Sequence, residues 1–211
     1  MSLNIEKTSL KEKIVSALME KIINGEIEVG DKLKEAHLAK AFGVSQAPVR
    51  EAIISLVSLG ILEHKPNVGA RVKEFDRAET IEIYEVRDAL EVYAVGHIVN
   101  FDKLDDLKDA YACMLKASEV KDIKLFVEHD KAFHSILIEM SGNSLILELW
   151  TQQYTKSSVH NVLKGFTSSL DEIIQMHLPI IEAIESASSV QCEQAVNAHY
   201  KKIIKNIKDK K

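Results

Sequence analysis

The sequence contains few cysteines and no long hydrophobic run. Its 211 residues include only two cysteines, Cys113 and Cys192, which lack CxxC spacing and so argue against both a disulfide framework and a cysteine-rich zinc module. No stretch approaches the roughly 18 consecutive apolar residues of a membrane helix, and the polar segment Met1 to Lys13 lacks the apolar core of a signal peptide. Fixed-period repeats and low-complexity tracts are also absent. We therefore expect a globular, cytoplasmic protein without a membrane partner.

Length and composition favour two domains of different charge. At a typical ~100–200 residues per domain, the chain is long enough for two small domains, and its 46% hydrophobic and 28% charged residues support a sizeable core. Residues 1–75 carry 11 Lys/Arg against 10 Asp/Glu (+1), and the remainder carries 16 against 22 (−6), which together give the total of −5. Phosphate contacts are screened beyond roughly 8–10 Å, so the first segment can still present a basic face to nucleic acid.

Residues 1–75 show the periodicity of three helices and a hairpin. Ser9 and Glu12 have the spacing of a capping box that begins the first helix. Gly43 ends the second helix, and Ser45 can cap the third. The expected elements are helices from Leu10 to Ile23, from about Glu35 to Phe42 and from about Gln46 to Gly60, followed by strands over 61–65 and 70–73.

Beyond Phe75 the apolar residues recur at helical spacing only, and no strand signal interrupts them. The expected helices cover roughly Arg77–Asn100, Leu104–Ser118, Ile123–Ser141, Leu145–Leu163, Leu170–Ala187 and Val190–Lys208. The sequence therefore predicts a mainly α protein, with a helix-turn-helix and hairpin domain over residues 1–75 and an all-helical bundle over residues 76–211.

A short helix, a tight turn and a second helix have the geometry that places a recognition helix in the major groove of DNA, which is about 12 Å wide. The exposed N-terminal end of the third helix would offer Ser45, Gln46 and Ala47, with Arg50 one turn later. Ser45 and Arg50 suit phosphates, Gln46 can pair with adenine, and Ala47 can contact a thymine methyl group. The alternative is that these side chains only cap and solvate a helix.

Two motifs in this segment are more specific than the spacing. They are Gly-Val-Ser-x-x-Pro-Val-Arg-Glu-Ala at residues 43–52 and Gly-Ala-x-Val at residues 69–72. Both resemble the winged helix-turn-helix of GntR-type bacterial transcription regulators, which implies that the protein binds a double-stranded DNA operator in a bacterial cytoplasm. In this resemblance the hairpin is the wing, and it contributes Lys65, Asn67, Gly69 and Arg71. The family usually has arginine where this chain has Ala36, Gln46 and Val68, so the operator sequence of relatives does not carry over.

Asp130 and His134 lie four residues apart in a predicted helix, so they share one face and can ligate one metal ion. His177 and His199 lie in later predicted helices, and an antiparallel bundle could bring both toward that face. On spacing alone, a surface Asp–His pair with the later histidines satisfied separately is the favoured alternative. The other histidines show no such convergence and are expected to be surface or packing residues; they are His37, His64, His97, His129 and His160.

The bundle carries a second resemblance. The segments Asp130-x-x-x-His134, Ser141-Gly142-Asn143, the region around His177 and Ala195-x-x-Ala198-His199 are similar to the helical effector domain of the FadR branch of the GntR family, the FCD domain. The resemblance implies that a divalent metal ion, zinc or nickel, is held by Asp130, His134, His177 and His199. Pro179 is less usual after the third ligand, and we expect it to kink its helix beside the site.

Charge and coordination indicate what such a site recognises. A divalent ion with one carboxylate and three neutral imidazoles keeps about one positive charge, and an octahedral ion would leave two positions open. A small organic acid can occupy them, with Arg87 and Asn143 as further effector contacts, the arginine by a bidentate fork. An ion pair between Arg87 and Glu91 at i+4 is an equal alternative for the arginine.

These features together predict a homodimeric DNA-binding transcription regulator, of the repressor type usual in the family, whose operator affinity a small carboxylate controls through the metal site. A purely structural metal with four protein ligands is one alternative. A metal-dependent enzyme is another. The sequence contains no His-Glu-x-x-His motif, nucleophile elbow or glycine-rich phosphate loop, so we expect no enzymatic activity.

Overall fold

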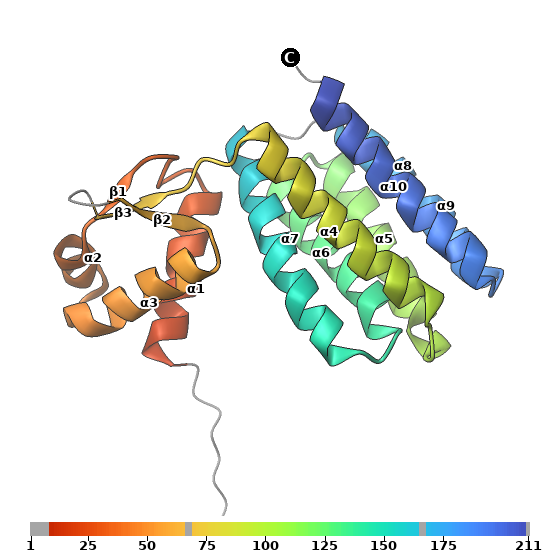
Figure 1. Cartoon of the computed structure of the whole chain (residues 1–211), viewed down its shortest axis with the longest axis horizontal. Helices are drawn as coiled ribbons and strands as arrows, with labels where there is room; N and C mark the ends of the chain where they lie inside the picture. The colour runs from red at the N-terminus through yellow and green to blue at the C-terminus, as the bar shows by residue number, and fades with distance from the viewer. Residues whose placement is uncertain (1–8, 66–68, 165–167, 210–211) are drawn as a thin grey trace, which may run out of the picture. The chain divides into compact units, whose positions relative to one another are not determined.

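The structure is a computed structural model of the chain, and it describes residues 9–65, 69–164 and 168–209 (Figure 1). The chain divides into two compact units, one of Met1–Phe75 with Val162–Lys164 and the other of Asp76–Asn161 with Gly165–Lys211. The first unit, the head, has three helices and a small sheet, whereas the described part of the second unit, the bundle, is helical throughout. The predicted mainly α fold, with a winged helix-turn-helix and a helical bundle, is confirmed.

Short-range signals fix the helices of the head. Ser9 and Glu12 form the predicted capping box, because the Ser9 hydroxyl accepts from the Glu12 amide and the Glu12 carboxylate accepts from the Ser9 amide. Gly43 ends the second helix with φ of 67°, in the left-handed region that favours glycine. The elements are α1 (Leu10–Ile23), β1 (Lys32–Leu33), α2 (Glu35–Phe42), α3 (Gln46–Ser58), β2 (Leu62–Lys65) and β3 (Gly69–Val72).

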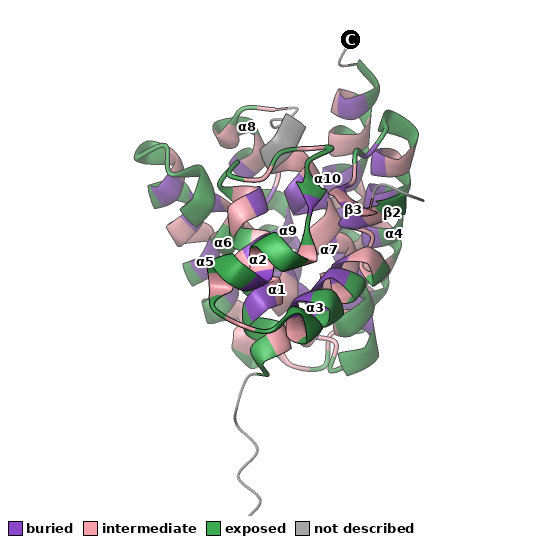
Figure 2. Ribbon diagram, turned by 90° about the vertical axis from the view of Figure 1, so that its left-hand side faces the viewer, coloured by how far each residue is buried: buried purple, intermediate pink, exposed green. Residues whose placement is uncertain are grey.

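The sheet of the head contains one strand more than the predicted hairpin. Its order is β1-β3-β2, with both pairs antiparallel and with Lys32 opposite Arg71 and Leu62 opposite Val72. The two-residue β1 was not predicted, because so short a strand has no periodicity. Figure 2 shows that α3 has both a buried and an exposed side. It packs on α1, and the buried residues of the two helices are Ile14, Leu18, Ile22, Val49, Ala52, Ile53 and Leu56.

The bundle is formed by seven α-helices and one 3₁₀ turn of the described chain. The predicted helix over 170–187 is two helices, because the chain breaks at Met176-His177 and Pro179 lies in the first turn of the second helix. Proline suits that position, since early helical N–H groups have no intrahelical partner. The elements are α4 (Arg77–Gly96), η1 (Phe101–Lys103), α5 (Leu104–Glu119), α6 (Ile123–Glu139), α7 (Ser144–Lys164), α8 (Leu170–Gln175), α9 (Leu178–Glu185) and α10 (Ser189–Asp209).

The core of the bundle surrounds several polar side chains. Helices α4 and α10 lie side by side (Figure 1), and α5 packs on α6. The largest fully buried side chains here are aromatic: Trp150, Tyr200, Phe126 and Phe133. Buried polar residues lie among them, and these are Thr80, Arg87, Glu91, His134, Ser157, Ser158, His177 and His199. Buried polar groups require partners, so this region is the place to look for a site. Within the described residues, no helix has the length and apolarity needed to cross a bilayer.

Asp88 contributes a pH-dependent contact between α4 and α10. Its Oδ2 accepts a hydrogen bond from Asn197 Nδ2 at 2.8 Å, and its Oδ1 is buried without a hydrogen-bond partner in the described part of the chain. Burial, which outweighs the bond from Asn197, raises the pKa of Asp88 to about 6. Because this pKa lies above that of an unfolded aspartate, the stability gained from the protonated carboxyl is complete at low pH and is lost as the pH rises through about 6.

We therefore expect Asp88→Asn to raise the free energy of unfolding near neutral pH by about 1 kcal/mol, and this gain to shrink as the pH falls and to vanish below about pH 4, where the parent carboxyl is neutral in both the folded and the unfolded chain. Urea unfolding of both proteins across this pH range measures the difference. The exposed Asp109, changed to Asn, is the control. A difference that stays constant with pH would contradict the assignment.

Candidate functional site

The N-terminal end of α3 presents the predicted DNA-contacting side chains to solvent. Ser45, Gln46, Ala47 and Arg50 are all exposed. Ser45 occupies the N-cap position of α3, but its side chain makes no capping hydrogen bond, so the predicted cap is wrong in that detail. The Ser45 hydroxyl therefore makes no contact with its own helix end. This exposed end of α3 has the shape and polarity of a recognition helix.

Arg50 is held by a carboxylate of the preceding helix. Its Nη2 lies 2.8 Å and its Nε 2.9 Å from Glu35 Oε2, and the guanidinium remains largely exposed. This exposed ion pair contributes little to stability, because solvent screens the two charges. It positions the arginine on the surface at the end of α3 while leaving it accessible to a phosphate.

The predicted wing residues lie on β2 and β3. Lys65 is exposed and its Nζ is 2.8 Å from Glu63 Oε1, whereas Gly69 and Arg71 are half-buried. Arg71 lies on the central strand β3, opposite Glu63 in β2. The predicted contact Asn67, like Pro66 and Val68, lies outside the described residues.

Three histidines converge inside the bundle. His134 comes from α6, His177 from the junction between α8 and α9, and His199 from α10. All three are at most 3% exposed, and one nitrogen from each lies within 4.8 Å of the other two. The Nε2 atoms of His134 and His177 are 3.1 Å apart. The structure thus brings together imidazoles that are distant in sequence, in the manner of a metal centre.

Asp130 adds a carboxylate to this cluster from one turn before His134. Its Oδ1 lies 3.3 Å from His177 Nε2 and 3.8 Å from His134 Nε2. Its Oδ2 accepts a hydrogen bond from the Tyr154 hydroxyl at 3.0 Å. Asp130 therefore approaches two of the three histidines, while the group of described donor atoms that all lie within 4.8 Å of one another consists of the three histidines alone. The break at Met176-His177, next to Pro179, is what turns the chain so that His177 can point inward.

The hydrogen bonds around the cluster fit a bound cation. His134 Nδ1 lies 2.7 Å from Glu91 Oε2, and His177 Nδ1 lies 2.7 Å from the carbonyl oxygen of Ile173. A carboxylate and a carbonyl only accept, so both Nδ1 atoms donate, and a ring protonated at Nδ1 alone would point the lone pair of its Nε2 into the cluster. In that tautomer the two Nε2 lone pairs and the Asp130 oxygen would face one another. A divalent metal ion satisfies all of them, and the Nδ1 bonds are those that orient metal-binding histidines.

The local electrostatics keep the cluster ready to bind a cation. Burial lowers the pKa of His199 well below its ordinary value, and the neighbouring His177 and His134 lower it further, so this ring is neutral. Burial acts to raise the pKa of Asp130, but the contacts of this carboxylate with His177 and His134 outweigh burial and hold that pKa below its usual range. A neutral imidazole beside an ionised carboxylate is the donor set that zinc and similar ions prefer.

Glu91 is the site residue that the sequence did not reveal. It is fully buried on α4, and its carboxylate accepts hydrogen bonds from His134, Trp150 and Tyr200. Burial acts to raise the pKa of Glu91, but the charge of His134 and its hydrogen bond lower that pKa overall. The sequence contains one signal for Glu91, its i+4 spacing from Arg87. That spacing predicts an ion pair between the two side chains, but it does not predict the contact of Glu91 with a histidine.

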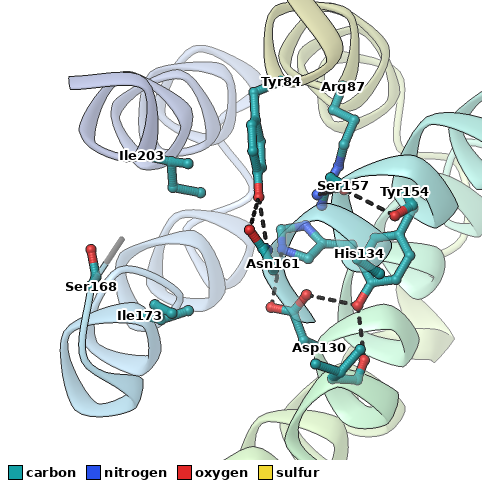
Figure 3. A pocket seen from close by; sticks show the side chains of 12 residues that line it. Tyr84, Arg87, Asp130, His134, Tyr154, Ser157, Asn161, Ser168, Ile173 and Ile203 are labelled. Carbon is teal, nitrogen blue, oxygen red and sulfur yellow. Dashed lines mark hydrogen bonds and ion pairs between the residues drawn. The ribbon is translucent and has the colours of Figure 1, made fainter. Parts of the chain in front are cut away.

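A cavity opens beside the cluster, with about 520 Å³ of empty space including the solvent at its mouth (Figure 3). Helices α4, α6 and α7 supply most of its wall, and α8 and α10 supply the rest. The lining residues are Tyr84, Arg87, Val127, Asp130, His134, Tyr154, Ser157, Ser158, Asn161, Ser168, Ile173 and Ile203. A ligand in this cavity would therefore contact two of the four candidate metal ligands, Asp130 and His134.

Arg87 makes the predicted ion pair with Glu91 and also lines the cavity. Its Nη2 lies 3.8 Å from Glu91 Oε1, which is the i+4 ion pair, and its Nη1 donates to Ser157 Oγ at 2.9 Å. It also lines the cavity, and its buried Nε has no hydrogen-bond partner in the described part of the chain. A buried guanidinium with a donor to spare is a strong attractor for an anion.

The remaining predicted residues lie elsewhere. Asn143 does not line this cavity; it precedes α7, and its side-chain oxygen accepts from the Ile146 amide at 3.3 Å. Its role in effector binding stays a prediction. The other five histidines belong to no metal-type group of the described residues. His37, His64 and His97 are exposed, while His129 and His160 are half-buried.

Comparison with known families matches both units of the chain. Residues 10–72 match the family model of bacterial regulatory proteins of the gntR family, and residues 82–202 match that of the FCD domain. Solved structures share the fold: E. coli McbR/YncC has a TM-score of 0.80 at 22% identity, covering 96% of this chain and 98% of that one. A transcriptional regulator GntR from Rhodococcus sp. RHA1 has a TM-score of 0.81 at 20% identity, covering 95% and 98%.

Curated relatives are similar over most of their length. One, from Paenarthrobacter nicotinovorans, is described as a probable D-xylose utilization operon transcriptional repressor; it is 26% identical over 94% of this chain and 88% of its own. The gluconate operon transcriptional repressor of Bacillus licheniformis is 29% identical, over 86% of this chain and 78% of its own. The chain belongs to the GntR family of bacterial transcription regulators, and it joins the DNA-binding head of that family to an FCD domain.

Proposed function

We propose that this regulator is a cytoplasmic repressor that binds a two-fold operator as a homodimer and senses a small organic acid at a divalent metal ion in its bundle. The observation that carries the proposal is the meeting of Asp130 and three buried imidazoles beside a cavity that contains a buried arginine. Dimerisation matches the symmetry of two half-sites, and it raises the effective concentration of the second head once the first is bound.

The cluster and the cavity beside it would make different contacts with an acid. Asp130, His134, His177 and His199 would hold the ion, zinc or nickel, and the ion would supply a Lewis-acidic anchor for a carboxylate. Arg87 would add charge-assisted hydrogen bonds to the same carboxylate. The charge of a divalent ion exceeds that of Asp130 by one, and Arg87 and Glu91 cancel each other. The site therefore holds one net positive charge for the ligand.

Helix α4 is the element that can report ligand binding. It carries Arg87 and Glu91, and it is also the first helix after the head in the sequence. A ligand that changes how Arg87 and Glu91 are held would bias the position of α4. A coupling free energy of ~1–3 kcal/mol between the two sites is sufficient for a several-fold to hundredfold change in operator affinity.

A structural metal with four protein ligands remains the second candidate, since four donors are present within reach. X-ray absorption spectroscopy of the metal-loaded protein distinguishes a sensor metal from a structural metal. A shell of five or six donors that changes when an acid is added supports the sensor, and a closed four-ligand shell that ignores every acid supports the structural role.

Arg50→Ala is expected to weaken DNA binding on operator and non-operator duplexes alike, and to reduce the dependence of affinity on salt by about one counterion per head, because Arg50 suits a phosphate. Filter binding to a duplex selected from a random pool measures both the affinity and its dependence on salt. Glu35→Gln is the matched control: it releases the guanidinium from its ion pair, so affinity should stay equal or increase. Unchanged affinity and salt dependence in Arg50→Ala would remove this residue from the interface.

His177→Ala is expected to lose bound metal and the response to acids while the head keeps its affinity for DNA, because the ring contributes a buried nitrogen to the cluster. Metal content after dialysis, measured by mass spectrometry, tests this. His97→Ala, at an exposed position, should retain the metal. Full metal occupancy in His177→Ala would show that the four-ligand assignment is wrong.

Glu91→Gln is expected to lower metal affinity about 10–100-fold, because Glu91 fixes the ring of His134 and outer-sphere carboxylates of this kind have effects of that size. Competition with a chromophoric chelator measures the affinity, and circular dichroism checks that the helices persist. Glu85→Gln, on the exposed side of α4, is the control. Metal affinity equal to that of the parent would assign Glu91 a packing role alone.

A further inference from the structure

The wall of the cavity next to Asp130 contains a polar pair that the metal centre does not use. Asn161 Nδ2 donates to the Tyr84 hydroxyl at 2.9 Å, and the same hydroxyl lies 3.3 Å from Asn161 Oδ1 (Figure 3). Tyr84 is 4% exposed and comes from α4, whereas Asn161 is half-buried on α7. Both line the cavity. An amide and a phenol can each donate and accept, and this is the chemistry that recognises a hydroxyl group.

Charge along the wall permits one carboxylate on the ligand. Arg87 is the permanent cation among the lining residues that the structure describes, and Glu91 already lies 3.8 Å from it. Asp130 is an anion on the same wall. A second ligand carboxylate would therefore find no unshared cation, and burying an unpaired charge is costly.

The side of the cavity away from Arg87 carries two isoleucines and one serine, Ser168, and no charged side chain among the described lining residues. Figure 3 shows Ile173 and Ile203 there, facing across from Arg87 and Tyr154. The far end of a ligand anchored at the cluster would meet these isoleucines. Carbon–hydrogen groups suit them, and an ionised group does not.

We propose that Tyr84 and Asn161 are specificity residues that select an acid with one carboxylate and hydroxyl groups on its carbon chain, and that exclude dicarboxylates and unsubstituted fatty acids. The carboxylate is oriented at the cluster and Arg87, the hydroxyls replace the Tyr84–Asn161 bonds, and the hydrocarbon face packs on Ile173 and Ile203. This assignment rests on the proposed function, because it presumes that the cavity binds an acid.

Two matched series of acids test the assignment on the metal-loaded, full-length protein by calorimetry. The four-carbon series is butyrate, threonate and tartrate, and the six-carbon series is hexanoate, gluconate and glucarate. Within each series the members differ in hydroxyl groups or in a second carboxylate. In at least one series, we expect the hydroxylated monoacid to bind about tenfold or more tightly than the other two members, because a site built to pair with hydroxyls is left unpaired by an analogue without them. Metal content is measured after each titration, to exclude loss of the ion to the acid.

Tyr84→Phe and Asn161→Leu identify the residues responsible. Each keeps much of the volume of the side chain and removes hydrogen-bonding groups, so each should reduce the preference for hydroxylated acids toward unity while metal content stays that of the parent. Tyr93→Phe, at an exposed position of the same helix α4, should keep the preference. Equal binding of all members in both series, or an unchanged preference in both variants, would overturn the inference and leave the acid sensor standing. If none of the six acids binds, the proposed sensing function fails together with it.

Discussion

One buried carboxylate organises the polar interior of the bundle. Glu91 accepts hydrogen bonds from a metal-binding type of histidine, an indole and a phenol, and it lies 3.8 Å from the guanidinium of Arg87. These partners come from α4, α6, α7 and α10. A charge buried this deeply is tolerated only while its partners are in place, and removing one partner leaves the others uncompensated. The orientation of the histidine ring and the position of the arginine are thus fixed by the same group, which links the candidate metal centre to the cavity beside it.

Local features of the fold could be predicted from the sequence, and features set by distant contacts could not. The capping box at Ser9 and the left-handed Gly43 depend on residues within one turn, so the sequence alone predicts their positions. Strand β1 exists only because its backbone pairs with β3, some 40 residues later, and two residues carry no period. The break before Pro179 was expected only as a kink, and the structure has separate helices there.

The candidate site likewise contains residues that local spacing predicts and residues that only distant contacts bring together. Asp130 and His134 were recognisable from helical spacing, whereas the approach of His177 and His199 followed from the resemblance to a family and not from any local rule. The sequence does not predict the role of Glu91, because Arg87, four residues earlier, already provides a partner for its carboxylate. Its bonds to Trp150 and Tyr200 span 59 and 109 positions of the chain. Sequence periodicity places a residue on a face, but it does not identify which side chains from other helices meet it.

The indole of Trp150 has a practical consequence. It is the single tryptophan of the chain, it is fully buried, and its Nε1–H donates to the carboxylate that also holds His134. This indole lies two hydrogen bonds away from the imidazole of His134, and a carboxylate beside an indole affects its fluorescence. The bundle therefore contains a native fluorescent probe of its own interior, unaffected by any tryptophan in the head.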